Sequence, residues 1–208
     1  MKVRAVALTG ALLAAGFAGS AQAAAKKPCN NMTDATGDVV FAQASNATAY
    51  EDAALDLVSG DLGADKKVIT GVIRLSKLAV PATTSIGTTY EMRISNAAGD
   101  VTTLWANLAA SGNTFGVGKL SEDLGGQGLA PETVNSTGTA TGFISKNEIH
   151  ISAPYSAFAG FKFGKKVGID QVIAKRGVPG QFYGRYADDA TGSKAYVLGA
   201  PTCVTPGK

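Results

Sequence analysis

Alternation of apolar and polar positions is the dominant pattern after residue 52. In residues 88–95, TTYEMRIS, the apolar positions Tyr90, Met92 and Ile94 alternate with polar ones. A period of two residues places successive side chains on opposite faces, as in a half-buried strand. Comparable runs predict strands over 53–58, 68–75, 101–108, 114–120, 142–145, 148–152, 167–174 and 196–198. The only helix that we expect is a single turn within 156–160, after Pro154.

Turn-forming residues separate these runs at short intervals. The clearest groups are 60–65, 96–100 and 111–113, which are rich in Gly, Asn and Asp. Gly reaches positive φ without a steric cost, and Asn and Asp tolerate it. The last two groups are short enough to close hairpins. Residues 120–138 carry no periodic pattern and predict a loop that crosses between sheets.

The fold class predicted by these elements is all-β. Many short strands joined by Gly-rich turns favour an antiparallel β-sandwich of jelly-roll or Ig-like type, with about eight to ten strands and little helix. Turns of this kind explain most of the 26 glycines among the 208 residues.

The first residues have the features of a secretory signal peptide. Lys2 and Arg4 precede an apolar run over 5–18, and Ala21-Gln22-Ala23 provides the small residues of a cleavage site, with a second possible cut after Ala25. The apolar run is shorter than the roughly 20 residues of a transmembrane helix. We therefore expect residues 1–23 to be removed, residues 24–208 to form one domain, and the product to be secreted without membrane insertion.

Export changes the interpretation of the two cysteines, Cys29 and Cys203. In an oxidising compartment, two cysteines in one small domain usually pair. The sequence therefore predicts a structural disulfide that ties the two ends of the domain together. Two free thiols are the alternative, and neither flank carries a C-x-x-C redox motif.

Four segments give the chain a family resemblance. They are TDATGD at 33–38, ALDLVSGD at 54–61, KVITGVIRL at 67–75 and NEIHISAP at 147–154. The chain resembles secreted bacterial β-sandwich domains of the DOMON-like superfamily, a group that includes family-nine carbohydrate-binding modules. It is also similar to secreted proteins of high-GC Gram-positive bacteria, whose Ala, Gly and Thr bias it shares.

The resemblance implies a binding or structural sandwich that in some members holds calcium, a sugar or haem. A haem site of this type needs an inward Met and His pair. Met92 shares the face of Tyr90 and Ile94, but His150 alternates with Ile149 and Ile151 and points away from the face that they bury. The sequence therefore argues against haem. Paired tryptophans that would clamp a sugar are missing too, since Trp105 is the only one.

An acidic stretch provides candidate ligands for calcium: Asp34, Asp38, Asp52 and Asp56. Calcium takes six to eight oxygens from carboxylates, carbonyls and water. The spacing is not that of an EF-hand loop. The alternative interpretation is that Asp34 and Asp38 cap a turn and that the other carboxylates are solvated.

Three aromatic residues are candidates for ligand binding: Trp105, Tyr183 and Tyr186. Trp105 lies opposite Leu104 and Leu108 in the two-residue period, and the tyrosines lie in a loop-like segment. An exposed flat ring beside polar groups can stack on a sugar or contact a partner. Edge packing in the sandwich is the alternative.

The remaining chemistry is sparse. The formal net charge of +3 is small and scattered, which argues against nucleic-acid binding. The single histidine, His150, has no G-x-S-x-G serine to pair with. We therefore expect a secreted, non-catalytic sandwich that binds an extracellular glycan or another macromolecule and can be stabilised by calcium. The alternatives are a small extracellular hydrolase and a structural envelope-associated protein.

Overall fold

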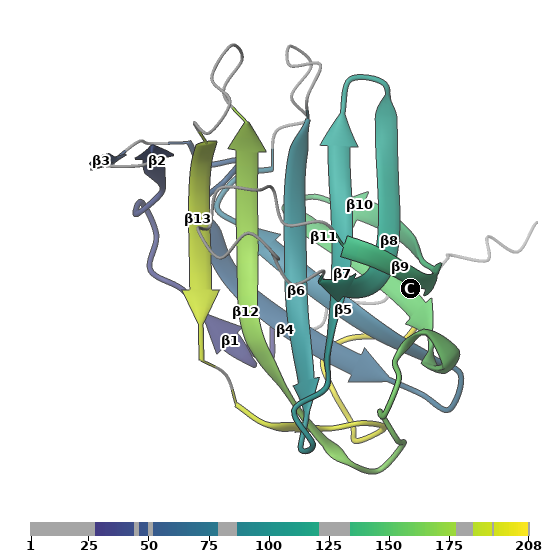
Figure 1. The fold of residues 1–208 in the computed structure, drawn as a ribbon. Helices are drawn as coiled ribbons and strands as arrows, with labels where there is room; N and C mark the ends of the chain where they lie inside the picture. The colour runs from purple at the N-terminus through teal and green to yellow at the C-terminus, as the bar shows by residue number, and fades with distance from the viewer. Residues whose placement is uncertain are drawn as a thin grey trace, which may run out of the picture.

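Two antiparallel sheets pack face to face in the computed structural model, which describes residues 28–43, 46–49, 52–78, 87–120, 134–177, 185–192 and 194–207 (Figure 1). Sheet A has five strands. In spatial order they are β1 (Met32–Thr33), β4 (Leu57–Ala64), β5 (Val68–Leu75), β11 (Glu148–Pro154) and β10 (Thr141–Ser145).

Sheet B has nine strands and lies in front of sheet A in Figure 1. Eight of them follow the order β3 (Asn46–Ala49), β2 (Val40–Gln43), β13 (Arg185–Thr191), β12 (Lys166–Gly177), β6 (Thr88–Asn96), β7 (Val101–Ala109), β8 (Gly112–Leu120) and β9 (Val134–Thr139). The ninth, β14 (Tyr196–Val197), pairs with β12. Since every pair of neighbouring strands is antiparallel, the predicted all-β antiparallel sandwich is confirmed.

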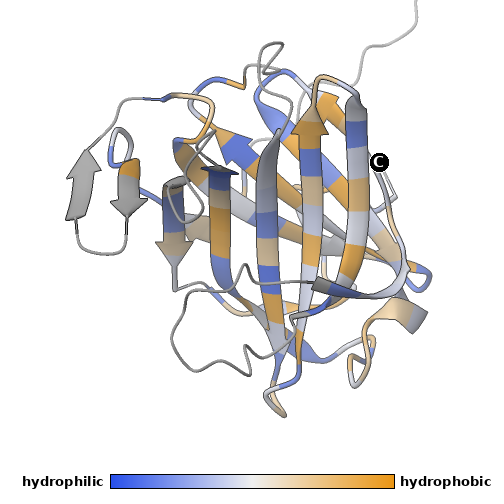
Figure 2. Cartoon of the chain, turned by 45° about the horizontal axis from the view of Figure 1, so that its top comes forward, coloured by the Kyte–Doolittle hydropathy of each residue, from blue (hydrophilic) through white to orange (hydrophobic). Residues whose placement is uncertain are grey.

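The core lies between the inner faces of the two sheets and follows the predicted alternation. Tyr90, Met92 and Ile94 of β6 are fully buried, and so are Ile149 and Ile151 of β11. Figure 2 shows this alternation as hydrophobic and hydrophilic bands along the strands. Each fully buried side chain of this size contributes roughly 1.5–3 kcal/mol of hydrophobic stabilisation.

Two glycines let the sheets approach closely around Met92. A Cβ at Gly60 would lie 3.2 Å from the Met92 methyl carbon, and a Cβ at Gly71 would lie 2.8 Å from its sulfur. The Met92 side chain therefore fills a depression in sheet A. Gly60 belongs to β4, so the turn predicted over 60–65 is wrong. This glycine makes room for a side chain of the other sheet, and Asp61 beside it is fully buried.

Most of the other predicted elements are confirmed within one to three residues. The hairpins at 96–100 and 111–113 join β6 to β7 and β7 to β8. The one helical element among the described residues is the 3-10 turn η1 (Tyr155–Ala157), next to the predicted position. The strand predicted over 53–58 begins only at Leu57. The prediction that residues 120–138 cross between sheets is wrong, because β9 begins at Val134 and pairs with β8 in the same sheet.

The fourteen strands of the described residues exceed the predicted eight to ten, because β1, β2, β3, β9 and β13 carry too little pattern to be predicted. The first three have only two to four residues each. Residues 1–23, the predicted signal peptide, lie outside the described residues. Within the described part of the chain, no helix has the length and apolar character needed to cross a membrane.

Both ends of the described chain meet on the outer face of sheet A. Cys29 and Cys203 form the predicted disulfide, with their Cα atoms 5.6 Å apart. The C-terminal segment then crosses β4 and β5. The Thr202 hydroxyl donates to the Leu62 carbonyl at 2.8 Å, and the Gly207 N–H donates to Thr70 Oγ1 at 2.9 Å. The disulfide thus fastens a segment that is also hydrogen-bonded to the sheet beneath it.

Candidate functional site

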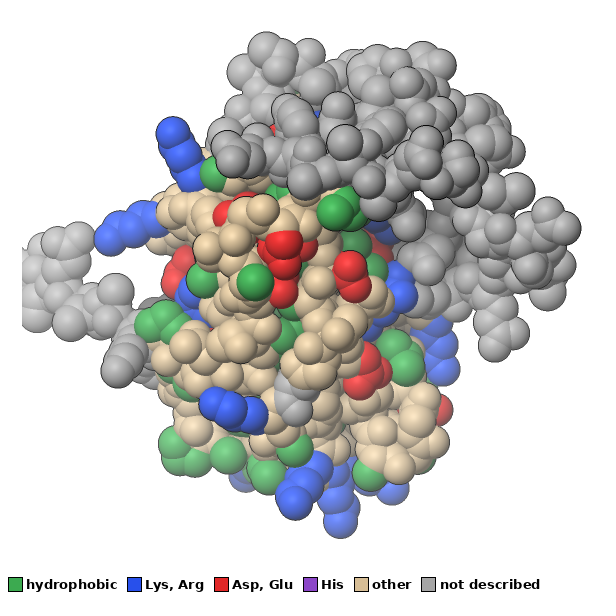
Figure 3. All heavy atoms as spheres, turned by 90° about the vertical axis from the view of Figure 1, so that its left-hand side faces the viewer, with side chains coloured by type: hydrophobic (Ala, Val, Ile, Leu, Met, Phe, Trp, Pro, Cys, Tyr) green, Lys and Arg blue, Asp and Glu red, His purple; other side chains and the backbone are tan. Residues whose placement is uncertain are grey.

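Three aspartates converge where the end of β1, the start of β4 and the strand β13 meet. Carboxylate oxygens of Asp34, Asp38 and Asp188 lie within 4.8 Å of one another. We call these three residues the acidic cluster. The space-filling view of this side of the molecule shows acidic side chains gathered on its upper half (Figure 3).

The loop that carries Asp34 and Asp38 is held against the start of β4 and the Asp56 side chain by two of its backbone N–H groups. The Asp34 N–H donates to the Val58 carbonyl at 3.0 Å, and the Gly37 N–H donates to Asp56 Oδ1 at 2.8 Å. Gly37 has a φ of +83°, which only glycine adopts freely. The hydroxyl of Ser76 donates to the second oxygen of Asp56. Both oxygens of Asp56 therefore accept hydrogen bonds, one from the loop and one from Ser76.

Asp188 enters the cluster from sheet B. Its side chain points inward from β13, it is only 4% exposed, and its Oδ2 accepts the Leu57 N–H at 2.7 Å. Burial, together with the nearby carboxylates of Asp34, Asp38 and Asp56, raises the pKa of Asp188 to about 7, against the Leu57 hydrogen bond. The folded protein thus holds this carboxylate where its charge is poorly compensated.

The charge of the Asp34 carboxylate is also poorly compensated. One of its oxygens, Oδ1, accepts the Ala35 N–H at 3.0 Å. The other, Oδ2, is buried and accepts no hydrogen bond from the residues that the structure describes. Burial and the neighbouring Asp38 raise the pKa of Asp34 to about 6. A buried, ionisable oxygen without a donor is an energetic cost that a bound cation would remove.

Of the four predicted calcium ligands, the structure brings Asp34 and Asp38 together and adds Asp188. Asp52 does not join them, because its Oδ2 pairs with Arg176 and its Oδ1 accepts the Ala54 N–H at 2.9 Å. Asp56 lies beside the cluster as a support for the loop.

Asp188 was missed because the segment around it carries no strand pattern. One signal was present: Asp188 and Asp189 are adjacent, and in any strand two adjacent residues face opposite sides. Once β13 is recognised as a strand with a buried face, one of the two carboxylates must point inward.

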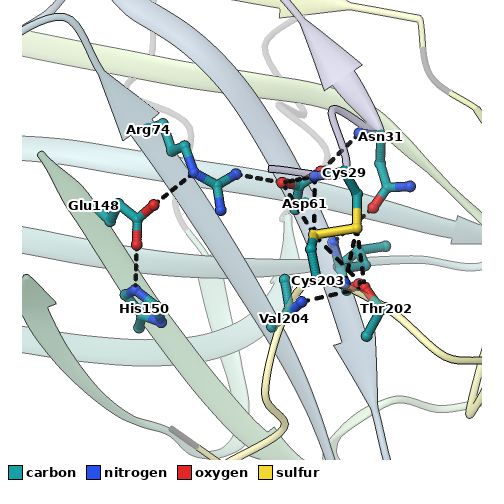
Figure 4. A network of polar contacts seen from close by, with 10 residues as sticks. Cys29, Asn31, Asp61, Arg74, Glu148, His150, Thr202, Cys203 and Val204 are labelled. Atoms are coloured by element: carbon teal, nitrogen blue, oxygen red, sulfur yellow. Dashed lines mark hydrogen bonds and ion pairs between the residues drawn. A yellow bond between two sulfur atoms is a disulfide. The ribbon is translucent and has the colours of Figure 1, made fainter. Parts of the chain in front are cut away.

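Asp61 shows what a compensated buried carboxylate looks like in the same fold (Figure 4). It is fully buried on the outer face of sheet A, beneath the disulfide. It accepts the N–H groups of Cys29 at 3.1 Å and Asn31 at 2.7 Å, and it pairs with the guanidinium of Arg74. Its oxygens therefore have a charged donor besides the backbone ones, whereas the acidic cluster has only backbone N–H donors among the described residues.

The Asp61 network continues along the outer face to the single histidine. Arg74 Nε lies 2.7 Å from Glu148 Oε1, and Glu148 Oε2 lies 3.0 Å from His150 Nε2 (Figure 4). Phe143 stacks on the His150 ring, with centroids 4.3 Å apart. The predicted outward orientation of His150 is thus confirmed, and its contacts explain it as part of a surface network.

The predicted aromatic site is only partly described. Trp105 lies on the outer face of sheet B, half-buried, with its indole against Gly116 of β8, where a Cβ would lie 2.1 Å from the ring. Its Nε1 is buried and has no hydrogen-bond acceptor among the described residues. Tyr183 lies outside the described residues, and Tyr186 lies in β13 with a side chain that the structure does not describe.

Polar side chains run across the outer face of sheet B beside Trp105. Lys175 and Arg93 contact Glu91, which is directly opposite Trp105 in the pairing of β6 with β7. The row continues from Arg93 to Gln171 at 2.9 Å and from Gln171 to Asp189 at 3.1 Å. We call these five residues (Glu91, Arg93, Gln171, Lys175 and Asp189) the outer polar row. It gives the face both charges and amide groups beside one indole ring.

The chain matches no model of a known protein family, no curated protein and no solved structure in the comparisons. The function is therefore argued from the sites themselves.

Proposed function

We propose that the protein is a secreted, non-catalytic β-sandwich that binds calcium at the acidic cluster. The observation that carries the proposal is the buried Oδ2 of Asp34, which has no donor within the described residues, in a carboxylate that has an oxygen within 4.8 Å of those of Asp38 and Asp188. The predicted leader and the disulfide support an extracellular location, where free calcium is abundant. The resemblance to DOMON-like domains, some of which hold calcium, favours the same proposal.

The chemistry of the donors favours calcium over softer metals. The cluster offers only oxygen, with no His or Cys among its three members, and hard oxygen donors suit calcium and magnesium. Three carboxylates are part of a calcium shell of six to eight oxygens, and the partial exposure of Asp34 and Asp38 leaves access for water. Magnesium demands a stricter octahedral geometry and retains its waters, which makes it the weaker candidate.

Titration calorimetry and thermal melts with calcium test this proposal. At calcium concentrations about 100-fold above the dissociation constant, one site adds about 2.7 kcal/mol to the free energy of unfolding. For a domain of this size the melting temperature then rises by roughly 5–10 °C. Asp188→Asn should abolish both the heat and the shift. Asp170→Asn, on an exposed carboxylate that accepts a hydrogen bond from Ser95, is the matched control and should retain them.

No heat and no shift with the wild-type protein at millimolar calcium would refute the proposal. An equal response of wild type and Asp188→Asn would also refute it, because calcium would then bind elsewhere.

A second candidate function is glycan binding on the face of Trp105. The specific observation is the half-buried indole beside the outer polar row, since a sugar ring needs both an apolar platform and hydrogen-bonding groups. We expect Trp105→Ala to reduce retention on an insoluble cell-wall or plant polysaccharide, and Phe143→Ala, on the outer face of the other sheet, to leave retention unchanged. Release of reducing sugars from the polysaccharide would favour the hydrolase instead. No retention of the wild type would favour the structural role.

A further inference from the structure

One end of the sandwich exposes lysines and apolar side chains together. It is formed by the turn between β4 and β5, the loop between η1 and β12, and the strand β14. We call this surface the basic end, and its residues are Lys66, Lys67, Lys162, Phe163, Lys165, Lys166 and Val197, all of them exposed. Figure 3 shows Lys and Arg side chains beside hydrophobic ones at the lower end of the molecule.

Backbone hydrogen bonds tie the loop and β14 together. The Gly164 N–H donates to the Leu198 carbonyl at 2.8 Å, and the Leu198 N–H donates to the Lys165 carbonyl at 3.0 Å. Lys166 and Val197 are direct partners in the pairing of β12 with β14. The loop thus projects its side chains from a backbone that is fixed at both sides.

The turn between β4 and β5 adjoins the same surface. The Tyr155 N–H donates to the Lys67 carbonyl at 3.1 Å, and the Ala64 N–H donates to the Tyr196 hydroxyl at 3.2 Å. Tyr196 immediately precedes Val197. The lysines of the turn and those of the loop therefore belong to one continuous end of the fold.

The apolar members of this surface stay in solvent although the core lies close by. Phe163 is 47% exposed and Val197 is 36% exposed. The Phe163 ring rests on Gly199, where a Cβ would lie 2.2 Å from it. Phe161, two residues earlier, is 7% exposed and packs edge-on against Phe158. The loop therefore anchors one phenylalanine in the core and presents the other outward.

The positive charge of the basic end is not neutralised by its neighbours. None of its five lysines forms an ion pair with a carboxylate that the structure describes. Two aspartates lie at this end: Asp65 in the turn between β4 and β5, and Asp100, whose carboxylate lies against Gly160 of the loop. The Asp65 carboxylate accepts the N–H groups of Lys67 at 2.7 Å and Val68 at 2.9 Å, and Asp100 accepts the Asn96 amide at 2.9 Å. Five lysines against two aspartates leave this end net positive.

We propose that the basic end docks the folded protein peripherally onto a membrane surface that carries anionic phospholipid headgroups. Lysines near such a surface gain electrostatic energy, and an exposed aromatic ring at the same place can enter the boundary between headgroups and acyl chains. A soluble polyanion would use the lysines but would gain nothing from Phe163 and Val197. The combination therefore favours a lipid surface, and the proposal is independent of calcium at the acidic cluster.

Co-sedimentation with vesicles tests this proposal, using the mature protein in EDTA so that calcium plays no part. We expect binding to phosphatidylcholine vesicles that contain about 25 mol% phosphatidylglycerol and none to pure phosphatidylcholine. Raising the salt from about 0.05 M to 0.5 M should release the protein, because the charges are exposed. Lys162→Gln/Lys165→Gln should weaken the affinity by roughly tenfold or more.

Two further variants separate this proposal from simple charge attraction. Lys77→Gln/Lys146→Gln removes the same charge from exposed positions beside Asn147, at the other ends of β5 and β11, and should bind like the wild type. Phe163→Ala should weaken binding several-fold without changing the salt dependence. Circular dichroism is the check that each variant is folded.

Equal binding to both vesicle compositions would overturn the proposal. So would unchanged vesicle binding by Phe163→Ala together with tight binding to dextran sulfate, because the surface would then recognise polyanions in general.

Discussion

Three aspartates in the described part of the chain are almost completely buried, Asp56, Asp61 and Asp188, and the last two differ in what surrounds them. Asp61 has a guanidinium and two backbone N–H groups, whereas Asp188 has one N–H group and two carboxylates. A buried charge with partners stabilises a specific structure, and a buried charge among like charges opposes folding. The same residue type therefore leads to opposite expectations at the two positions.

The acidic cluster predicts an unusual pH dependence for the calcium-free protein. The pKa values of Asp34 and Asp188 rise to about 6 and about 7 on folding, from 3.8. A raised pKa means that the folded state binds more protons than the unfolded state at intermediate pH, so this contribution to stability is lost as the pH rises through 6–7. We expect a lower melting temperature at pH 8 than at pH 5 in EDTA.

The variant Asp188→Asn isolates this contribution, because an amide at this position can still accept the Leu57 N–H. It should raise the melting temperature of the calcium-free protein at pH 8 and reduce the difference between pH 5 and pH 8. In excess calcium the wild type should reverse its behaviour and gain most at pH 8, where the ligands are ionised. A wild-type protein that melts at the same temperature at both pH values would contradict the expectation.

Asp61→Asn, in contrast to Asp188→Asn, should destabilise the protein. It removes the charge that Arg74 and the N–H groups of Cys29 and Asn31 surround, and breaking a buried pair on one side costs about 3–5 kcal/mol. Urea unfolding at pH 7 measures the loss. Glu148→Gln, which removes the half-exposed partner of the same guanidinium, should cost less than about 1 kcal/mol. Equal costs would show that burial of Asp61 is not what matters.

At the scale of elements, the strands with a long alternating pattern were predictable and the short or unusual ones were not. The strands β6 and β7 have eight or nine alternating residues each, so their faces and hairpin could be derived directly. β4 was obscured by Gly60, Asp61 and Gly63, which are typical of turns. These three residues fit into a strand because of contacts with other elements: Gly60 with Met92 of β6, Asp61 with Arg74 of β5, and Gly63 with Val204 of the C-terminal segment. A local sequence pattern carries no information about such contacts.

The candidate site was predictable to a similar degree. Asp34 and Asp38 lie close in the sequence, so their proximity was visible there. Asp188 joins them through the pairing of β13 with β12 and the packing of β13 near β4, more than a hundred residues away.

The contact between Gly71 and Met92 gives a test at this scale. Gly71→Ala places a methyl group 2.8 Å from the Met92 sulfur and 3.0 Å from a Leu104 methyl carbon, and overpacking of this kind costs about 1–3 kcal/mol. Met92→Ala empties the depression in sheet A, so we expect Gly71→Ala to cost less stability in that background. The cost of the double variant in urea unfolding should then be smaller than the sum of the single costs. Thr141→Ala, on an exposed position of β10, is the control and should change stability by less than about 0.5 kcal/mol. Additive costs at Gly71 and Met92 would contradict the packing described here.

At the scale of the whole molecule, the disulfide, the basic end and the acidic cluster occupy separate parts of one sandwich. The disulfide joins segments 174 residues apart in the sequence on the outer face of sheet A. The basic end is formed by turns at one end of the strands, and the acidic cluster lies at the margin between β1 and β13. A membrane docked at the basic end would therefore leave the cluster and the face of Trp105 available to solutes and partners.

The last prediction concerns the disulfide between Cys29 and Cys203. The disulfide lowers the conformational entropy of the unfolded chain. For a loop of this length, the chain-entropy model gives a gain of at most about 5 kcal/mol in the free energy of unfolding. Cys29→Ala/Cys203→Ala should therefore lower the melting temperature by up to roughly 10–20 °C. The sheets should persist, because the core between them does not include either cysteine. Reduction of the wild type by dithiothreitol should produce the same loss, and the double variant should not respond to the reductant.

Because Asp61 accepts the N–H of Cys29, freeing this segment also exposes a buried carboxylate, and Asp61→Asn should cost less in the double variant than in the oxidised protein. A wild-type protein that melts at the same temperature before and after reduction would show that hydrogen bonds alone hold the two ends in place.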